Sequence, residues 1–292
     1  MNTKTQELVS IIIPTYNDSN NLMEAINSCL NQDYKNIEIL ICDDGSIDPT
    51  ENIVKEYQKK YPNVVRYFKL KHSESPAIAR NVGLKNVKGE FISFLDSDDL
   101  MCKNKLTRQV LLLRQNSSID IVCSNAIKFS VPLEEKGLYH KDLKEGYIFL
   151  KDMLSGNKVI NSSILMRKKL IHDMELLYER KFYLKNIKKF FYEDYEYWLR
   201  ALILQKTIYY LPETLTKYRI NNLGISSNST KEKEIQGKIN TLLISSKITS
   251  INKEDRKNIL KKIKFYKKYL YKIKLKTIIK KYFLDNENPP HN

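Results

Sequence analysis

Three carboxylates fall within four positions directly after an apolar run in this chain. The run covers residues 91–95, and the acidic stretch is Asp96-Ser97-Asp98-Asp99. Carboxylates this close are costly to keep ionised unless a cation lies among them. Hard oxygen ligands of this kind suit Mg²⁺ or Mn²⁺, which usually keep positions open for phosphate oxygens. The alternative is an acidic turn that caps a helix beginning near Leu100, and this stretch alone does not decide between them.

The first hundred residues alternate apolar runs with helical patterns. Continuous Val/Ile/Leu-rich runs at 9–13, 37–42 and 64–68 are typical of strands buried on both faces, which means parallel strands covered by helices. Residues 21–32, and a second stretch around Val54, carry apolar side chains at helical spacing. The order strand, helix, strand, helix predicts βαβ units in an α/β fold.

Polar residues follow each of these strands. Residues 14–17 (Pro-Thr-Tyr-Asn) come after the first strand, Asp43 and Asp44 after the second, and the acidic stretch 96–99 after the run at 91–95. In open sheets of this type, ligands bind outside the carboxyl ends of the strands. We therefore expect both acidic clusters to lie close together in space.

Five short motifs occur in a fixed order along the chain. They are Ile-Pro-Thr-Tyr-Asn at 13–17, Asp-Asp-Gly-Ser-x-Asp at 43–48, Ala-Arg-Asn-x-Gly at 79–83, Phe-Leu-Asp-Ser-Asp-Asp at 94–99 and Glu-Asp-Tyr-Glu-Tyr-Trp-Leu-Arg at 193–200. Together they resemble the motifs of family 2 glycosyltransferases, over about residues 8–227. The resemblance implies a GT-A fold (a Rossmann-like mixed sheet flanked by helices), a nucleotide-sugar donor, a divalent metal and inversion at the anomeric carbon.

The resemblance assigns the metal to the acidic stretch. Mn²⁺ or Mg²⁺ held by Asp96 and Asp98 would bridge the diphosphate oxygens and act as a Lewis acid. Asp98 is the stronger candidate for a direct ligand, and Asp96 could instead hold the ribose. Asp99 is more often the cap of a helix starting near Leu100 than a direct contact.

The resemblance also implies a set of contacts to the donor base. Asp44 is the expected acceptor for a pyrimidine N–H, which would select uracil, and Tyr16 would stack on the base. Pro14 would supply backbone contacts, with Asn17 beside it, although Pro14 could also simply end the strand. Asp43 could shape only the turn that follows it.

Diphosphate contacts and the catalytic base are expected further along. Arg80 would contact the diphosphate or base, its alternative being an exposed helix arginine, and Arg219 would neutralise phosphate charge. An inverting transfer needs one carboxylate to take the acceptor proton. We assign this role to Asp194 in preference to Glu193; the structural alternative is that both are first-turn acidic residues favoured by the helix dipole. Trp198 fits core packing better than a sugar platform.

Two departures from the family pattern are visible. The usual Asn-x-Gly before Ala-Arg-Asn is here Ser73 and Ser75 followed by Pro76, which predicts a differently shaped loop over the nucleotide. The usual Tyr-Arg-x-His is here Tyr-Arg-Ile-Asn, so Asn221 stands where many relatives have a histidine that helps to hold the metal or diphosphate.

Length and composition predict a cytoplasmic protein with one large domain and an appendage. We expect a GT-A domain at 1–228 (nucleotide half 1–100, acceptor half 101–228) and a helical C-terminal region at 229–292. No apolar run approaches the about 18 residues of a membrane span, and the N-terminus has no secretory pattern. The four cysteines and four histidines show no metal spacing, and neither a P-loop nor G-x-G-x-x-G occurs.

The positive charge is concentrated near the C-terminus. Residues 231–281 hold 17 Lys/Arg against 4 Asp/Glu, and the tail from Ile259 suits a helix with one apolar stripe and a lysine-rich face. An anionic membrane surface contacted through residues 256–284, at the inner face of the plasma membrane, is one interpretation. Packing against the domain or homo-oligomerisation is another, and nucleic acid is the least favoured.

The sequence thus predicts an inverting, metal-dependent hexosyl- or N-acetylhexosaminyltransferase. It would move a sugar from a UDP-sugar to a hydroxyl of a glycan or lipid-linked glycan in cell-surface polysaccharide synthesis. A nucleotidyltransferase should carry a Gly-rich basic loop, which residues 14–17 lack. A catalytically silent nucleotide-sugar-binding or scaffold protein of the same fold is the alternative that Asn221 leaves open.

Overall fold

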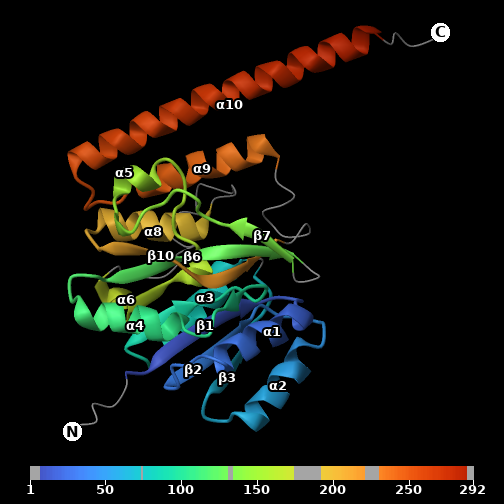
Figure 1. Ribbon diagram of the computed structural model, residues 1–292. Coiled ribbons are helices and arrows are strands. Elements are labelled where there is room, and N and C mark those ends of the chain that lie inside the picture. Colours follow the sequence, from blue (N-terminus) through green and yellow to red (C-terminus); the bar gives the residue numbers. More distant parts are fainter. Residues whose placement is uncertain (1–6, 74, 131–133, 174–191, 221–229, 288–292) are drawn as a thin grey trace, which may run out of the picture.

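The strands of the N-terminal half form one side of a large mixed sheet in the computed structural model of the chain (Figure 1). The structure describes residues 7–73, 75–130, 134–173, 192–220 and 230–287. In these residues the sheet has ten strands, eight of them in the order β3-β2-β1-β4-β9-β6-β10-β5, while β7 pairs with β6 and β8 with β10. Their bounds are β1 Val9–Thr15, β2 Ile37–Asp43, β3 Val65–Lys69, β4 Phe91–Phe94, β5 Leu100–Met101, β6 Ile121–Ser130, β7 Glu134–Leu138, β8 Gly146–Ile148, β9 Leu165–Arg167 and β10 Ile208–Arg219.

The first four strands are parallel, as the continuous apolar runs predict. Each neighbour in β3-β2-β1-β4 pairs in parallel, whereas β9 lies antiparallel between β4 and β6. Strands β6 and β10 are again parallel. The carboxyl ends of β1, β2 and β4 therefore meet at one edge of the sheet, and this edge positions the site.

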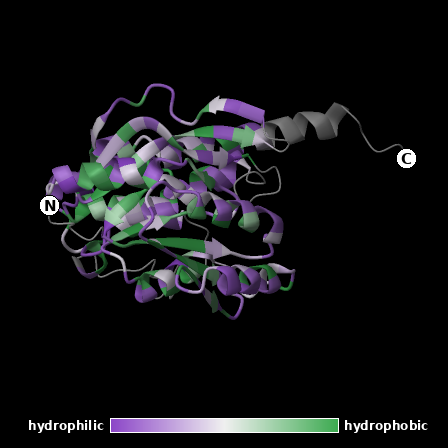
Figure 2. Cartoon of the chain, turned by 60° about the horizontal axis from the view of Figure 1, so that its bottom comes forward, coloured by the Kyte–Doolittle hydropathy of each residue, from purple (hydrophilic) through white to green (hydrophobic). Residues whose placement is uncertain are grey.

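Helices cover both faces of the sheet, and the sheet divides the apolar core into two clusters. Alternate residues of β1 point to opposite sides: Ile11 and Ile13 belong to one apolar cluster and Ile12 to the other, as the two-residue period of a strand requires. Figure 2 shows hydrophobic strands between helices with polar outer surfaces. The helices are α1 Ser19–Leu30, α2 Thr50–Lys60, α3 Pro76–Asn86, α4 Lys105–Gln115, α5 Leu150–Met153, α6 Leu170–Asp173, α8 Glu193–Ile203, α9 Lys231–Ser245 and α10 Lys253–Glu287.

The C-terminal helices stack in layers above the sheet. Helix α8 covers the sheet, α9 packs on α8, and α10 runs across α9 with its far end extending beyond the body (Figure 1). The apolar stripe predicted for the tail is buried at Ile259, Ile263, Tyr266 and Leu270. In the part of the chain that is described, no helix combines the length and apolar character that crossing a membrane requires.

The helix expected to begin near Leu100 is not there. Residues 100 and 101 form β5, antiparallel to Lys217 and Thr216 of β10, and the next helix begins only at Lys105. The interpretation of Asp99 as its N-cap is therefore wrong, because the pairing with β10 holds this segment extended. The first strand also continues through Pro14, which lies opposite Cys42, to Thr15.

Candidate functional site

The loops after β1, β2 and β4 are tied together by hydrogen bonds at the carboxyl edge of the sheet. The Asn17 amide donates to Ser46 Oγ at 2.9 Å, and its side-chain Oδ1 accepts from the Ile47 amide at 2.9 Å. Ser97 Oγ donates to Asp18 Oδ2 at 2.7 Å. Asn17 adopts a φ of +49°, a left-handed conformation that asparagine tolerates well. The expected gathering of the polar strand ends is present in the structure.

The adjacent aspartates after β2 have different surroundings. Asp43 shapes the turn, since Oδ1 accepts from the amide and hydroxyl of Ser46 at 2.8 and 2.6 Å. Asp44 instead points across to the loop before α3, where Oδ1 accepts from Ser73 Oγ at 2.6 Å and from the Ser73 amide at 3.0 Å. His72 Nδ1 lies 3.0 Å from Asp44 Oδ2. Asp44 is thus a buried carboxylate aligned at the site edge by its neighbours.

An aromatic pair lies beside Asp44. The rings of Tyr16 and His72 are stacked, with centroids 4.1 Å apart and planes 14° from parallel, and Tyr16 is 44% exposed. A ring fixed on one face by His72 can accept a planar base on the other. Sequence reasoning did not identify His72 or the bonding role of Ser73; the departure from Asn-x-Gly was the one signal that this loop differs.

Arg80 connects the acidic stretch to the start of α8. It is buried on α3, and its guanidinium donates to Asp96 Oδ1 at 2.7 Å and to Glu193 Oε1 at 3.3 Å. The alternative of an exposed helix arginine is therefore wrong, because α3 turns this side chain inward to two carboxylates. Segments 113 residues apart in the chain thus meet in one site.

The acidic stretch carries more negative charge than its surroundings neutralise. Burial, followed by the charges of Asp96 and Asp18, raises the pKa of Asp98 to about 6. Burial and the neighbouring carboxylates also raise the pKa of Asp99 well above its usual range. Such a donor set fits a divalent cation, whose charge would offset this repulsion.

No ready-made cage of protein ligands surrounds this charge. Among the described residues, no group of three or more His, Cys, Asp or Glu side chains is arranged to hold a metal ion. Mg²⁺-type sites commonly use one or two carboxylates and complete their coordination with substrate phosphates and water. Asp96 and Asp98 fit that pattern, whereas Asn221 lies outside the described residues.

Arg219 closes the site from the end of β10. It is buried, its backbone amide donates to Asp99 Oδ1 at 2.9 Å, and its Nε donates to the Asp98 carbonyl at 2.7 Å. Its guanidinium also reaches Glu24 Oε2 at 2.6 Å. Asp99, expected at a helix cap, thus acts as the anchor of this arginine.

Asp194 lies in the first turn of α8, beyond the Arg80 bridge. Asn157 Nδ2 donates to Asp194 Oδ2 at 3.1 Å. Burial, followed by the charge of Glu193, raises the pKa of Asp194 to about 7, while Arg80 lowers it. A carboxyl of that pKa can exchange protons near neutral pH. Trp198, on the same helix, is fully buried with Phe94 beside it, as the apolar helix pattern predicted.

Comparison with known proteins gives consistent matches. Residues 10–174 match the family described as "Glycosyl transferase family 2". The chain is 31% identical over 235 residues to the Escherichia coli protein "UDP-Glc:alpha-D-GlcNAc-diphosphoundecaprenol beta-1,3-glucosyltransferase WfgD", covering 77% of this chain and 82% of that one.

Two solved structures resemble the fold as a whole. S. aureus TarS 1–349 in complex with UDP-GlcNAc superposes with a TM-score of 0.67 at 21% identity, over 87% of this chain and 70% of that one. The mannosyltransferase PcManGT from Pyrobaculum calidifontis, in complex with GDP-Man and Mn²⁺, gives 0.63 at 14% identity, over 91% and 70%. The GT-A architecture expected from the motifs is thereby confirmed. Together with the family match over residues 10–174, these findings show that the chain belongs to glycosyl transferase family 2.

Proposed function

We propose that this glycosyltransferase inverts the anomeric carbon of a UDP-sugar as it passes the sugar to a hydroxyl of a glycan or lipid-linked glycan. The observation that carries the proposal is the Arg80 bridge, with contacts of 2.7 Å to Asp96 and 3.3 Å to Glu193. It links the acidic stretch to Glu193, the residue directly before Asp194. Residues 1–100 would hold the donor, 101–228 the acceptor, and 229–292 would form the appendage.

The base of the donor would bind between Tyr16 and Asp44. Tyr16 offers one ring face, since His72 stacks on the other, and Asp44 would accept the N–H of uracil. Pro14 and Asn17 line the same strand end. Support comes from the UDP-Glc in the name of the E. coli relative and from the UDP-GlcNAc in the TarS complex.

Asp96 and Asp98 would hold Mn²⁺ or Mg²⁺ together with the diphosphate. The ion would supply Lewis-acid stabilisation of the leaving diphosphate, in line with the Mn²⁺ of the PcManGT complex. The protein itself contributes positive charge from Arg80 and Arg219, whose buried guanidinium groups contact the acidic stretch at Asp96 and at the Asp98 carbonyl. Both are held by carboxylates and so need little reorganisation as charge develops.

Asp194 would act as the general base. Its carboxylate takes the proton of the acceptor hydroxyl while the hydroxyl oxygen forms a bond to the anomeric carbon. The bond from that carbon to the diphosphate oxygen breaks, and its electron pair leaves with the diphosphate. Attack from the face opposite the leaving group inverts the centre. Glu193 is already paired with Arg80, which favours Asp194 for this role.

A lipid-linked acceptor has support from one relative's name. The E. coli protein acts, by its name, on a GlcNAc-diphosphoundecaprenol, a sugar carried on a membrane lipid. We extend this acceptor class to the present chain, with a hexosyl or N-acetylhexosaminyl group as the sugar that is moved. The synthesis of cell-surface polysaccharide is the setting in which such acceptors are used.

A donor screen tests the proposal. Thermal-shift measurements with UDP-, GDP- and CDP-sugars, each with and without Mn²⁺, should show the largest rise in Tm for a UDP-sugar with the metal. Slow release of UDP from the same sugar should follow, since water can replace the acceptor. If no nucleotide sugar shifts Tm, the donor site is wrongly assigned. Binding without any release or transfer would favour the catalytically silent alternative.

A further inference from the structure

The long helix α10 already has its apolar face covered by the domain. Ile259, Ile263, Tyr266 and Leu270 follow one another at intervals of four, three and four residues and are buried in the same apolar cluster as α8 and α9. These spacings place the four side chains on one side of a helix. The domain therefore satisfies the apolar stripe of α10, and what remains exposed is the opposite side.

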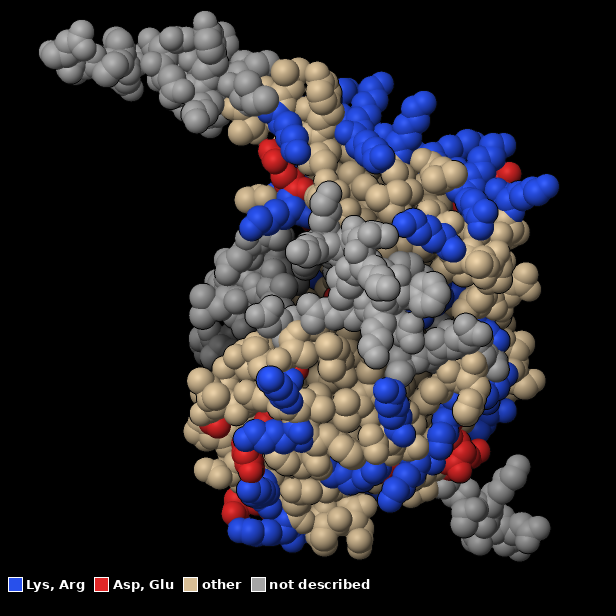
Figure 3. Space-filling model, turned by 180° about the vertical axis from the view of Figure 1, so that it is seen from behind, with Lys and Arg blue, Asp and Glu red and all other residues tan. Residues whose placement is uncertain are grey.

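That opposite side carries a row of lysines. Each of the first four lies two positions before one member of the buried row, a rotation of about 200° around a helix. All are exposed, and Figure 3 shows lysines gathered along this part of the molecule. Within the described residues, a carboxylate partner is recorded for one member of the row, Lys257 with Glu254 at 3.9 Å. The members of the outer lysine row are Lys257, Lys261, Lys264, Lys268 and Lys272.

Large apolar side chains are interleaved with the outer lysine row. Phe265 is 58% and Tyr271 68% exposed, on either flank of the row when the helix is viewed along its axis. Leu260 and Leu275 are exposed as well. On a helix face that only contacts water, four exposed apolar side chains gain nothing from burial. Lysines with aromatic and aliphatic neighbours are instead typical of helices that lie in a membrane interface.

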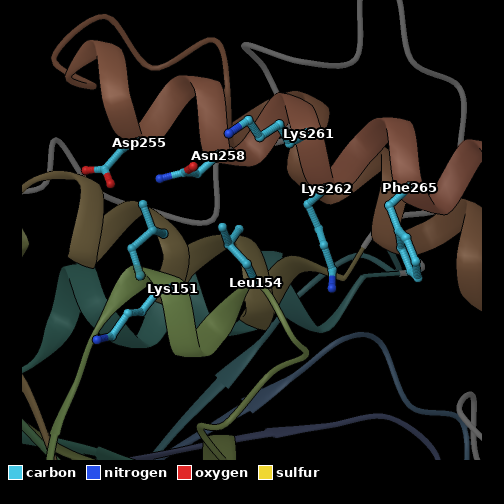
Figure 4. Close-up of a pocket in the computed structure, with 8 residues that line it drawn as sticks. Lys151, Leu154, Asp255, Asn258, Lys261, Lys262 and Phe265 are labelled. Atoms are coloured by element: carbon cyan, nitrogen blue, oxygen red, sulfur yellow. The ribbon is translucent and has the colours of Figure 1, made fainter.

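A groove extends this surface onto the neighbouring helix α5. It has a volume of about 470 Å³ and runs between α5 and the first turns of α10. Figure 4 shows Leu154, the residue directly after α5, facing the side chains of α10 that line the other wall. Lys151, Lys261 and Lys262 supply three positive charges against the single carboxylate of Asp255, and Leu154 and Phe265 supply apolar surface. The lining thus combines a site for an anionic head group with one for the first carbons of a chain.

We propose that the outer face of α10, together with the α5–α10 groove, docks the protein on an anionic lipid bilayer. The lysines would be attracted to the negative surface potential, and Phe265, Tyr271 and the leucines would enter the headgroup region. The apolar face of α10 stays on α9, so the helix lies along the membrane without leaving the domain. This docking does not depend on the proposed chemistry, because it involves no residue of the site.

Vesicle co-sedimentation of the full chain tests the proposal. We expect binding to vesicles of phosphatidylcholine with 30% phosphatidylglycerol in 0.1 M NaCl, and none to phosphatidylcholine alone. Changing all five lysines of the outer row to Gln keeps helix propensity and should weaken binding by about tenfold or more. The matched control changes five exposed lysines elsewhere to Gln and should bind like the wild type: Lys35, Lys59, Lys60, Lys85 and Lys103.

A second variant tests insertion of the aromatic side chains. Phe265→Gln with Tyr271→Gln leaves every lysine in place, so it should bind at 0.1 M NaCl but lose binding at 0.5 M, where charge attraction is screened. If this variant binds the vesicles at 0.5 M NaCl as well as the wild type does, insertion of Phe265 and Tyr271 into the bilayer is ruled out. Circular dichroism and unchanged UDP-sugar binding would show that both variants are folded.

Several results would overturn the proposal as a whole. Equal binding to neutral and anionic vesicles would exclude recognition of charge, and equal loss in the control variant would move the docking surface elsewhere. Light scattering of the wild type measures its oligomeric state and tests the remaining alternative, self-association through this face. A stable dimer that the outer-row variant abolishes, with no vesicle binding, would make this face an interface between two copies. Failure of the donor screen would leave all these results unaffected.

Discussion

Charged side chains are held in opposite ways at the two surfaces to which we assign a function. At the carboxyl edge of the sheet, Asp44, Arg80 and Arg219 are buried and each is fixed by specific partners. On the outer face of α10 the lysines are exposed to solvent. Buried charges must be paired and therefore specify geometry, whereas exposed charges act mainly through their sum. Single substitutions should therefore be decisive at the first surface and nearly silent at the second.

The largest effect is expected from Asp194→Asn. The change removes the proton acceptor but keeps size and the contact from Asn157, so donor affinity should barely change while kcat falls by roughly 10²–10⁴. Steady-state kinetics with separate measurement of UDP-sugar binding checks this. Glu193→Gln is the matched control at the adjacent position and should cost far less. If the Glu193 variant is the inactive one, the roles are exchanged; if both stay active, the base lies elsewhere.

Asp98→Asn should be the next most damaging change. A neutral amide replaces a carboxylate ligand, and since Lewis-acid stabilisation is worth several kcal/mol, transfer should fall by at least about a hundredfold. The fold should survive, because burial and the charges of Asp96 and Asp18 already disfavour the ionised Asp98. Activity at saturating Mn²⁺ and Tm should be measured on one preparation. Wild-type activity in this variant would remove Asp98 from the metal site.

Asp44→Ala should mainly weaken donor binding. Loss of a hydrogen bond to the base is worth about 1–3 kcal/mol, so the Kd for UDP should rise between about five- and 150-fold, with a smaller change in kcat. Calorimetric titration with UDP gives the comparison. Ser73→Ala is a useful companion, because it removes one donor to Asp44 at 2.6 Å and should reproduce part of the effect. An unchanged affinity in the Asp44 variant would place base recognition on other residues.

The pH profile should show a smaller, graded effect. A base must be deprotonated to act, and the pKa of Asp194 is raised to about 7 in the free protein, so kcat/KM should fall about tenfold per unit below that pH and level off above it. The same raised pKa favours the fold in acid, and this contribution to stability is lost as the pH rises from about 4 to 7. A profile that is flat from pH 5 to 8 would argue against Asp194 as the titrating group.

The sequence predicts the first four parallel strands well because its signals there are local. Continuous apolar runs identify β1, β2, β3 and β4, and the position of the acidic clusters at strand ends follows from the rule for open sheets. The helical spacing of the tail likewise predicts α10 and its apolar stripe, whose packing against the domain the structure then shows. In each case the information lies within a few consecutive residues, so no tertiary contact is needed to read it.

Contacts between distant segments are what the sequence could not show. Strand β5 is only two residues long, which is too short to show the alternation of apolar and polar residues that identifies a strand. Only its pairing with β10 distinguishes it from the first residues of a helix following Asp99. Arg80 has the pattern of a surface helix residue, and its burial follows from carboxylates 16 and 113 residues away. The support of Asp44 by Ser73 depends on the path of a loop that departs from the family motif.

The smallest effect on stability is expected from a substitution on the outer face of α10. Comparing it with a substitution on the buried face of the same helix tests most directly whether the two faces differ. Lys268→Ala should change the free energy of unfolding by less than about 0.5 kcal/mol, because Lys268 is exposed and exposed side chains contribute little to stability. Ile263→Ala, five positions earlier on the buried row, should cost about 2–5 kcal/mol, because it leaves a cavity against α9. Urea unfolding of the two variants and the wild type gives both values. Similar losses for the two would mean that the lysine row also packs against the domain, and the contrast between a structural inner face and an electrostatic outer face would fail.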